Sequence, residues 1–301
     1  MEEKALRLSA VFLMILTAVS FVLLPKLPAL HTWEVEAREE RIAEEEFAQS
    51  QVTMQNLKIK EQNEAAGAKG ELSIRLPEGV TGDQIAVSND YVTQTIRVEI
   101  PQADRTYFDS YPVLGNSDYI DGLSYTRQGE TGVIEVTTNK VYELQTEYDA
   151  QNFYFNFLTP HEVYDKVVVI DAGHGGRAVG ANKRGINEKD IDLAIVLKLK
   201  EIFDNSDQNI GVYYTRTDDS NPTFDQRVQL ANKSDADLFI SIHNNSTRSG
   251  RMSGTSGTQV MYDETSEASR QFAQICLEEV TGRIGSRDKG LVEGDSIYII
   301  R

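Results

Sequence analysis

The sequence has 301 residues, with 30 basic and 47 acidic side chains and a formal net charge of −17. A chain this acidic is unsuited to binding nucleic acid through phosphate neutralisation, so we expect no nucleic-acid partner. Its 40% hydrophobic and 26% charged residues are typical of globular proteins, and its single Cys excludes an intrachain disulfide framework.

Residues 1–30 are predicted to form a signal anchor or transmembrane segment. The apolar run over residues 10–24 (AVFLMILTAVSFVLL) follows Lys4 and Arg7 and is ended by Pro25. This order is typical of a secretory signal, and the run is at the short end of what can span a bilayer. Cleavage of the segment therefore stays open, and either outcome places the rest of the chain outside the cytoplasm.

Residues 31–69 are rich in Glu, Gln and Ala, and we expect an acidic stalk or helix there. The apolar residues keep no strict heptad, which argues against a coiled coil. A charged linker is the interpretation we favour.

Residues 70–160 have the pattern of a small all-β, sandwich-like domain. Apolar and polar residues alternate in ELSIRL, QTIRVEI and NFYFNFL, and turn sequences such as PEGVTGD and VLGNSD separate the segments. The many aromatic residues of this region could form a carbohydrate-stacking surface, but we favour core and cross-strand packing.

Residues 166–301 alternate strand and helix patterns. The run KVVVIDAGHGG predicts a buried parallel strand that leads into a Gly-rich loop, and IDLAIVLKLKEIF predicts an amphipathic helix. Further strands and helices follow in alternation. The predicted fold class is α/β, a twisted and mostly parallel sheet flanked by helices.

Two of the four histidines lie where predicted strands end. His174 follows the first strand in DAGHGG, His243 ends a later strand in SIHNN, and Glu188 lies in the first turn of a helix. Two imidazoles and one carboxylate are a common catalytic zinc set, because they leave a fourth position open. His31 and His161 have no carboxylate or glycine context and are expected to be ordinary polar residues.

Five segments in order closely resemble the zinc-dependent N-acetylmuramoyl-L-alanine amidases of the peptidoglycan amidase type 3 family: VVVIDAGHGG, GINEKD, YYTRTDD, FDQRVQLAN and DLFISIHNNS. The resemblance covers nearly all of residues 166–301 and places that family's zinc ligands on His174, Glu188 and His243. It implies a Zn²⁺ cofactor and hydrolysis of the amide between N-acetylmuramic acid and L-alanine in peptidoglycan. The protein would be membrane-anchored or secreted to the cell wall.

The same resemblance suggests roles for other polar residues. Arg216 could hold a substrate carboxylate or brace the sheet, whereas Arg227 is expected to be structural. Asn244 and Asn245 could donate hydrogen bonds to the substrate or within their loop. We take Arg216 and Asn245 as the candidate substrate-binding residues. The β domain resembles wall-targeting modules in architecture alone.

The expected general base is a glutamate on a late strand. In the family this glutamate follows a segment similar to GLVEGDSIYIIR. That segment ends this sequence at Arg301, so we expect a truncated sequence with the base beyond Arg301. Glu293 does not match the position of that base. The alternative function is a non-catalytic peptidoglycan-binding or regulatory pseudoenzyme, and a different metallohydrolase is a third hypothesis.

Overall fold

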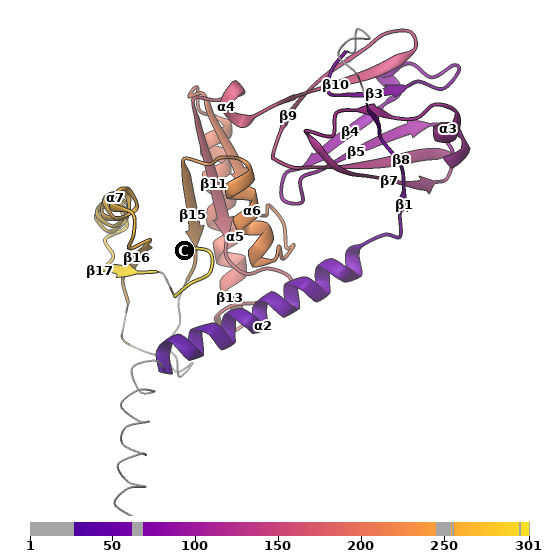
Figure 1. Cartoon of the computed structure of the whole chain (residues 1–301). Helices are drawn as coiled ribbons and strands as arrows, with labels where there is room; N and C mark the ends of the chain where they lie inside the picture. The colour runs from indigo at the N-terminus through magenta and orange to yellow at the C-terminus, as the bar shows by residue number, and fades with distance from the viewer. Residues whose placement is uncertain (1–26, 62–68, 245–253, 255, 295, 301) are drawn as a thin grey trace, which may run out of the picture. The chain divides into compact units, whose positions relative to one another are not determined.

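The computed structural model describes the chain except residues 1–26, 62–68, 245–253, 255, 295 and 301 (Figure 1). The predicted anchor at residues 1–30 therefore lies almost wholly outside the described residues. Among the residues that are described, no helix is both long and apolar enough to cross a membrane. The chain divides into two compact units, residues 43–246 and residues 1–42 with 247–301.

The acidic segment is a helix followed by short strands, rather than the charged linker that we favoured. Helix α2 spans Leu27–Ser50 and consists largely of the good helix formers Glu, Ala and Arg. Strands β1 (Gln55–Asn56) and β2 (Lys60–Glu61) then pair with the β domain.

The β domain consists of two five-stranded sheets that share one hydrophobic core. The first sheet has the order β1, β7 (Ile120–Gln128), β8 (Thr131–Thr138), β5 (Thr95–Pro101) and β4 (Ala86–Asp90). The second has the order β2, β6 (Leu114–Gly115), β3 (Leu72–Arg75), β10 (Asn152–Leu158) and β9 (Glu143–Tyr148). Short helices lie in the connections: η3 (Gly82–Gln84), α3 (Arg105–Ser110) and α4 (Pro160–Val163).

Alternating burial of the predicted strands explains the sandwich. Strands β5 and β10 bury every second residue, and Val98 and Phe155 at their centres are 0% exposed. Phe108, Tyr125 and Tyr142 are buried in the same core. These aromatic side chains therefore serve packing, as the favoured interpretation predicted.

The α/β class is confirmed in the region that follows. Strand β11 (Lys166–Ala172) lies between β14 (Ile210–Tyr214) and β15 (Leu238–Ile242), and both pairings are parallel. A small hairpin, β12 (Asn182–Lys183) and β13 (Ile186–Asn187), precedes helix α5 (Glu188–Asp204), and helix α6 (Phe224–Lys233) connects β14 to β15.

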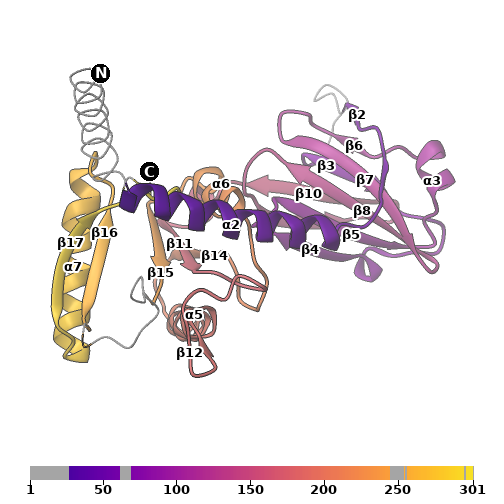
Figure 2. The same ribbon diagram turned by 90° about the horizontal axis from the view of Figure 1, so that it is seen from below.

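Helices α5 and α6 cover opposite faces of this sheet (Figure 2). Val167 and Val169 of β11 pack in one cluster with Leu230 of α6. The alternate residues Val168 and Ile170 pack in another cluster with Val196 of α5. Because β11 is buried on both faces, its residues 167–170 form a continuous apolar run.

The other unit contains a β-α-β arrangement. Strands β16 (Thr258–Tyr262) and β17 (Asp288–Glu293) are parallel neighbours, and helix α7 (Glu267–Ile284) connects them. Ala273 and Leu277 of α7 are buried, and Cys276 beside them is partly buried.

Candidate metal centre

The candidate metal centre lies at the carboxyl edge of the three-stranded sheet. Because β11 and β15 are parallel neighbours, both strands end at this edge, and Ala172 is in register with Ile242. His243 follows the end of β15 directly, and His174 follows the end of β11 after Gly173. Glycine is required at residue 173, since a Cβ atom there would lie 2.3 Å from Cε1 of His243.

Three ligand atoms meet in a nearly equilateral triangle. His174 Nε2 lies 3.2 Å from His243 Nδ1, and each of these nitrogens lies 3.3 Å from Glu188 Oε1. Two ligands of one tetrahedral zinc ion, each about 2.0–2.1 Å from the metal, lie about 3.3–3.4 Å apart. The three residues predicted as metal ligands are thus brought together with a spacing that fits zinc.

Glu188 is held at the start of α5 as a charged carboxylate. Its Oε2 accepts a hydrogen bond from Ala181 N at 2.7 Å, and its Oε1 accepts one from Asn244 N at 2.8 Å. Burial alone would raise the pKa of Glu188, but hydrogen bonds from His174, His243 and the Ala181 N–H outweigh it and hold the pKa well below its usual range. An ionised carboxylate is the form that binds a metal.

Asp192 is a fourth acidic or imidazole residue of this cluster, and the sequence interpretation missed it. It is 0% exposed, and with it included the four ligand atoms of the group lie within 4.8 Å of one another. Its Oδ1 accepts a hydrogen bond from Asn244 Nδ2 at 2.7 Å, and burial raises its pKa to about 6. The signal for it was available, because Asp192 follows Glu188 by four residues on one helix face.

Arg227 has the structural position that we expected. It is 1% exposed and forms an ion pair with Asp171, which is 0% exposed. Its guanidinium also donates to the carbonyl oxygens of Ala172 at 2.8 Å and His174 at 2.9 Å. Arg227 therefore braces the loop that carries one candidate ligand.

Arg216, the predicted substrate-binding residue, is 3% exposed. Its Nε donates to Ala172 O at 2.9 Å, and its Nη2 donates to Gly173 O at 2.7 Å and Lys189 O at 2.9 Å. The substrate contact stays a prediction, and this geometry favours a bracing role instead. Asn245, the other predicted substrate-binding residue, lies outside the described residues.

His161 is not part of the candidate centre. It belongs to α4, where its Nε2 lies 2.8 Å from Asp235 O. For His31, helix α2 is described but the side chain is not.

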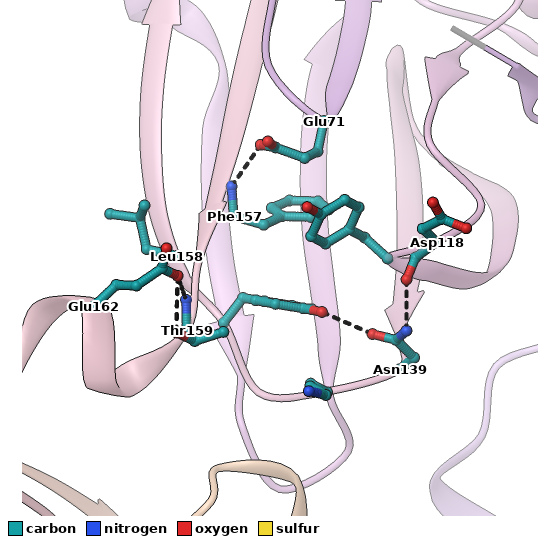
Figure 3. Close-up of a pocket in the computed structure, with 10 residues that line it drawn as sticks. Glu71, Asp118, Asn139, Phe157, Leu158, Thr159 and Glu162 are labelled. Carbon is teal, nitrogen blue, oxygen red and sulfur yellow. Dashed lines mark hydrogen bonds between the residues drawn. The ribbon is translucent and has the colours of Figure 1, made fainter. Parts of the chain in front are cut away.

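A pocket of about 590 Å³ lies in the β domain and at its connection to α4 (Figure 3). Its wall combines aromatic rings, carboxylates and one ammonium group. Glu71 Oε2 accepts a hydrogen bond from Phe157 N at 2.9 Å, and Asn139 Nδ2 donates to Asp118 O at 2.7 Å. None of the predicted site residues lines this pocket.

Fold and site together define an α/β protein with a candidate mononuclear metal centre built from two histidines and a glutamate. Residues 168–301 match the profile of the N-acetylmuramoyl-L-alanine amidase family. This part of the chain thus matches the family of peptidoglycan amidases, type 3, that the sequence resemblance predicted.

Several curated proteins are similar in sequence to this chain. The chain is 38% identical over 141 residues to the uncharacterized protein YqiI of Bacillus subtilis, covering 45% of this chain and 63% of that protein. It is 33% identical over 123 residues to the N-acetylmuramoyl-L-alanine amidase CwlM of Bacillus licheniformis, covering 41% of this chain and 47% of that protein. The chain thus spans about half to two thirds of the length of these curated relatives.

Among solved structures, the chain is similar to the catalytic domain of the amidase CwlV from Bacillus (Paenibacillus) polymyxa var. colistinus. The identity is 36%, the match covers 45% of this chain and 73% of that chain, and the TM-score is 0.41. An N-acetylmuramoyl-L-alanine amidase from Clostridium difficile 630 matches at 32% identity, 45% and 73% coverage and a TM-score of 0.42.

Proposed function

We propose that this chain is a zinc-dependent N-acetylmuramoyl-L-alanine amidase that cleaves peptidoglycan outside the cytoplasm. The observation that carries the proposal is the triangle of His174, Glu188 and His243, whose ligand atoms lie 3.2–3.3 Å apart. Two histidines and one glutamate are a set found in catalytic rather than structural zinc sites, because three protein ligands leave a position for water or substrate.

The residues of the chain prepare this site in distinct ways. His174, Glu188 and His243 would hold the ion, and the chemistry supplied by bound zinc is polarisation of the amide carbonyl and availability of hydroxide near neutral pH. Gly180 leaves space beside the ligands, since a Cβ there would lie 2.6 Å from His174 Cδ2. Arg216 keeps the loop after β11 in place through backbone carbonyl groups.

The test is release of free L-alanine amino termini from purified peptidoglycan by the protein extended past Arg301, where the sequence resemblance places the general base. We expect release that a chelator abolishes and added zinc restores, and no release by His174→Ala. His161→Ala is the matched control, because it removes an imidazole outside the centre. Peptidoglycan binding without any release by folded, zinc-loaded protein would instead support the non-catalytic alternative, and cleavage of another bond would support a different metallohydrolase.

We extend the proposal to the two regions before the amidase domain. Residues 1–30 would act as a signal anchor, which protease accessibility of the amidase domain on intact cells tests. The β domain would bind the cell wall, and the pocket with Tyr119 and Lys140 in its lining is the place where a wall fragment could bind. Sedimentation of the protein with peptidoglycan should then weaken when Lys140 is replaced by Glu.

A further inference from the structure

Glu188 and Asp192 lie one turn apart on α5, so both carboxylates face the end of β15. Asn244, the residue after His243, donates hydrogen bonds to both carboxylates. Its backbone N–H donates to Glu188 Oε1 at 2.8 Å, and its side-chain Nδ2 donates to Asp192 Oδ1 at 2.7 Å. The two carboxylates therefore hold the backbone and the side chain of the same residue.

Among the three candidate ligands, His243 depends most on these hydrogen bonds for its orientation. Its side chain is 36% exposed, against 10% for His174 and 6% for Glu188. Packing therefore restricts the His243 ring less than it restricts the other two side chains. The backbone conformation at residues 243 and 244 sets the orientation of the His243 ring. The hydrogen bonds of Asn244 hold this conformation.

Asp192 lies too far out to complete the zinc coordination itself. The three predicted ligands span 3.3 Å, and including Asp192 widens the group to 4.8 Å. Two ligands of one zinc ion lie at most about 4.2 Å apart, which is twice the metal–ligand distance. Asp192 is also 0% exposed, so it does not face solvent or substrate.

The second oxygen of Asp192 is in a position where a nearby positive charge would stabilise it. Oδ2 is buried and has no hydrogen-bond partner among the residues that the structure describes. A buried carboxylate with so few donors is costly unless a positive charge lies close to it. A divalent ion bound by two neutral imidazoles and Glu188 carries one net positive charge, which the charge of Asp192 would balance.

We propose that Asp192 is a positioning residue of the metal centre, which orients His243 through Asn244 and balances the charge of the bound ion. The inference rests on the proposed metal-dependent function. Groups that support metal ligands in this way typically contribute roughly 10–100-fold to metal affinity.

The experiment measures Co²⁺ binding to the full chain by competition with a chelator, together with the visible absorption spectrum of bound Co²⁺. Three variants are compared: Asp192→Ala, Asp192→Asn and the control Asp190→Asn. Asp190 is an exposed carboxylate on the same helix, hydrogen-bonded only locally to Asn187.

We expect Asp192→Ala to lose roughly 10–100-fold in Co²⁺ affinity and to change the spectrum, because the Asn244 tether is gone. Asp192→Asn should keep the spectrum, since its amide oxygen can still accept from Asn244, and should lose less affinity because only the charge is removed. Asp190→Asn should behave as wild type.

Wild-type affinity and spectrum in both Asp192 variants would overturn the inference. If Asp192→Ala does not fold, Asn244→Ala takes its place, and an unchanged Co²⁺ spectrum in that variant would overturn the inference equally. Failure of the proposed function is separate: His174→Ala and His243→Ala would then bind Co²⁺ as tightly as wild type.

Discussion

Replacing Arg227 by Met should strongly destabilise the α/β region around strand β11. Met keeps most of the buried aliphatic volume but removes every donor of a guanidinium that is 1% exposed. The lost partners are Asp171 and the carbonyl oxygens of Ala172, His174 and Pro222. Asp171 would stay fully buried without its cation. Breaking a buried ion pair from one side costs about 3–5 kcal/mol, a large part of the 5–15 kcal/mol that stabilises a typical domain.

The assay must separate the two domains, because a single unfolding free energy is not defined for a chain of several domains. Native-state hydrogen exchange, read by mass spectrometry, gives an opening free energy for each peptide. Peptides from β11 should lose about 3–5 kcal/mol in Arg227→Met. Peptides from β5 and β10 should be unchanged, since these strands belong to a different core.

The matched control is Arg177→Met. Arg177 also pairs with carboxylates, at 3.0 Å from Glu45 and 3.1 Å from Glu46, but its side chain is 53% exposed. Exposed ion pairs contribute little to stability because water screens them, so this variant should change exchange in β11 very little. Equal effects of the two substitutions, or a loss below about 1 kcal/mol for Arg227→Met, would refute the role assigned to burial.

Three further predictions follow from the same geometry. Glu188→Gln should bind zinc more weakly without losing the fold, which metal analysis after dialysis against a weak chelator measures; undiminished zinc content would contradict its role as a ligand. Gly173→Ala should lower metal affinity, because the new Cβ would lie 2.3 Å from His243 Cε1 and the ring must move; an unchanged Co²⁺ titration would show that the ring position is not critical. The pKa of Asp171 lies below its usual value, because the Arg227 charge and hydrogen bonds outweigh burial. The ionised carboxylate therefore contributes to folding stability above its unfolded pKa of about 3.9, and this contribution is lost as the pH falls below that value. Exchange protection of β11 that stays constant from pH 7 to pH 2 would contradict this.

The centre of the α/β region could be predicted because its residues leave strong local signals. The run from Val167 to Ile170 has the continuous apolar character of a strand buried on both faces, and the structure places it in the middle of the sheet. Parallel neighbours end at one edge, so two strand-end histidines had to lie close together. The first turn of α5 brings Glu188 to the same edge.

The other parts could not be predicted because their partners are distant or are main-chain atoms. The guanidinium of Arg216 donates to carbonyl oxygens, which leave no side-chain pattern in a sequence. Strands β1 and β2 have two residues each, too few for any alternation to be recognised. The contact between Glu46 and Arg177 joins residues 131 apart, and neither residue type is unusual at the surface.

The buried side chains of Arg227 and Arg216 explain how the candidate metal centre keeps its shape. His174 has a φ of 58°, a left-handed conformation that costs a residue with a side chain about 1–2 kcal/mol. Arg227 holds this turn by donating to the carbonyl oxygen of His174, and Arg216 holds the carbonyl oxygen of the preceding Gly173. A metal ion that binds the folded loop alone stabilises it further by mass action. Loop geometry and metal affinity are therefore coupled, so Arg227→Met should weaken metal binding as well as folding, although Arg227 touches no metal.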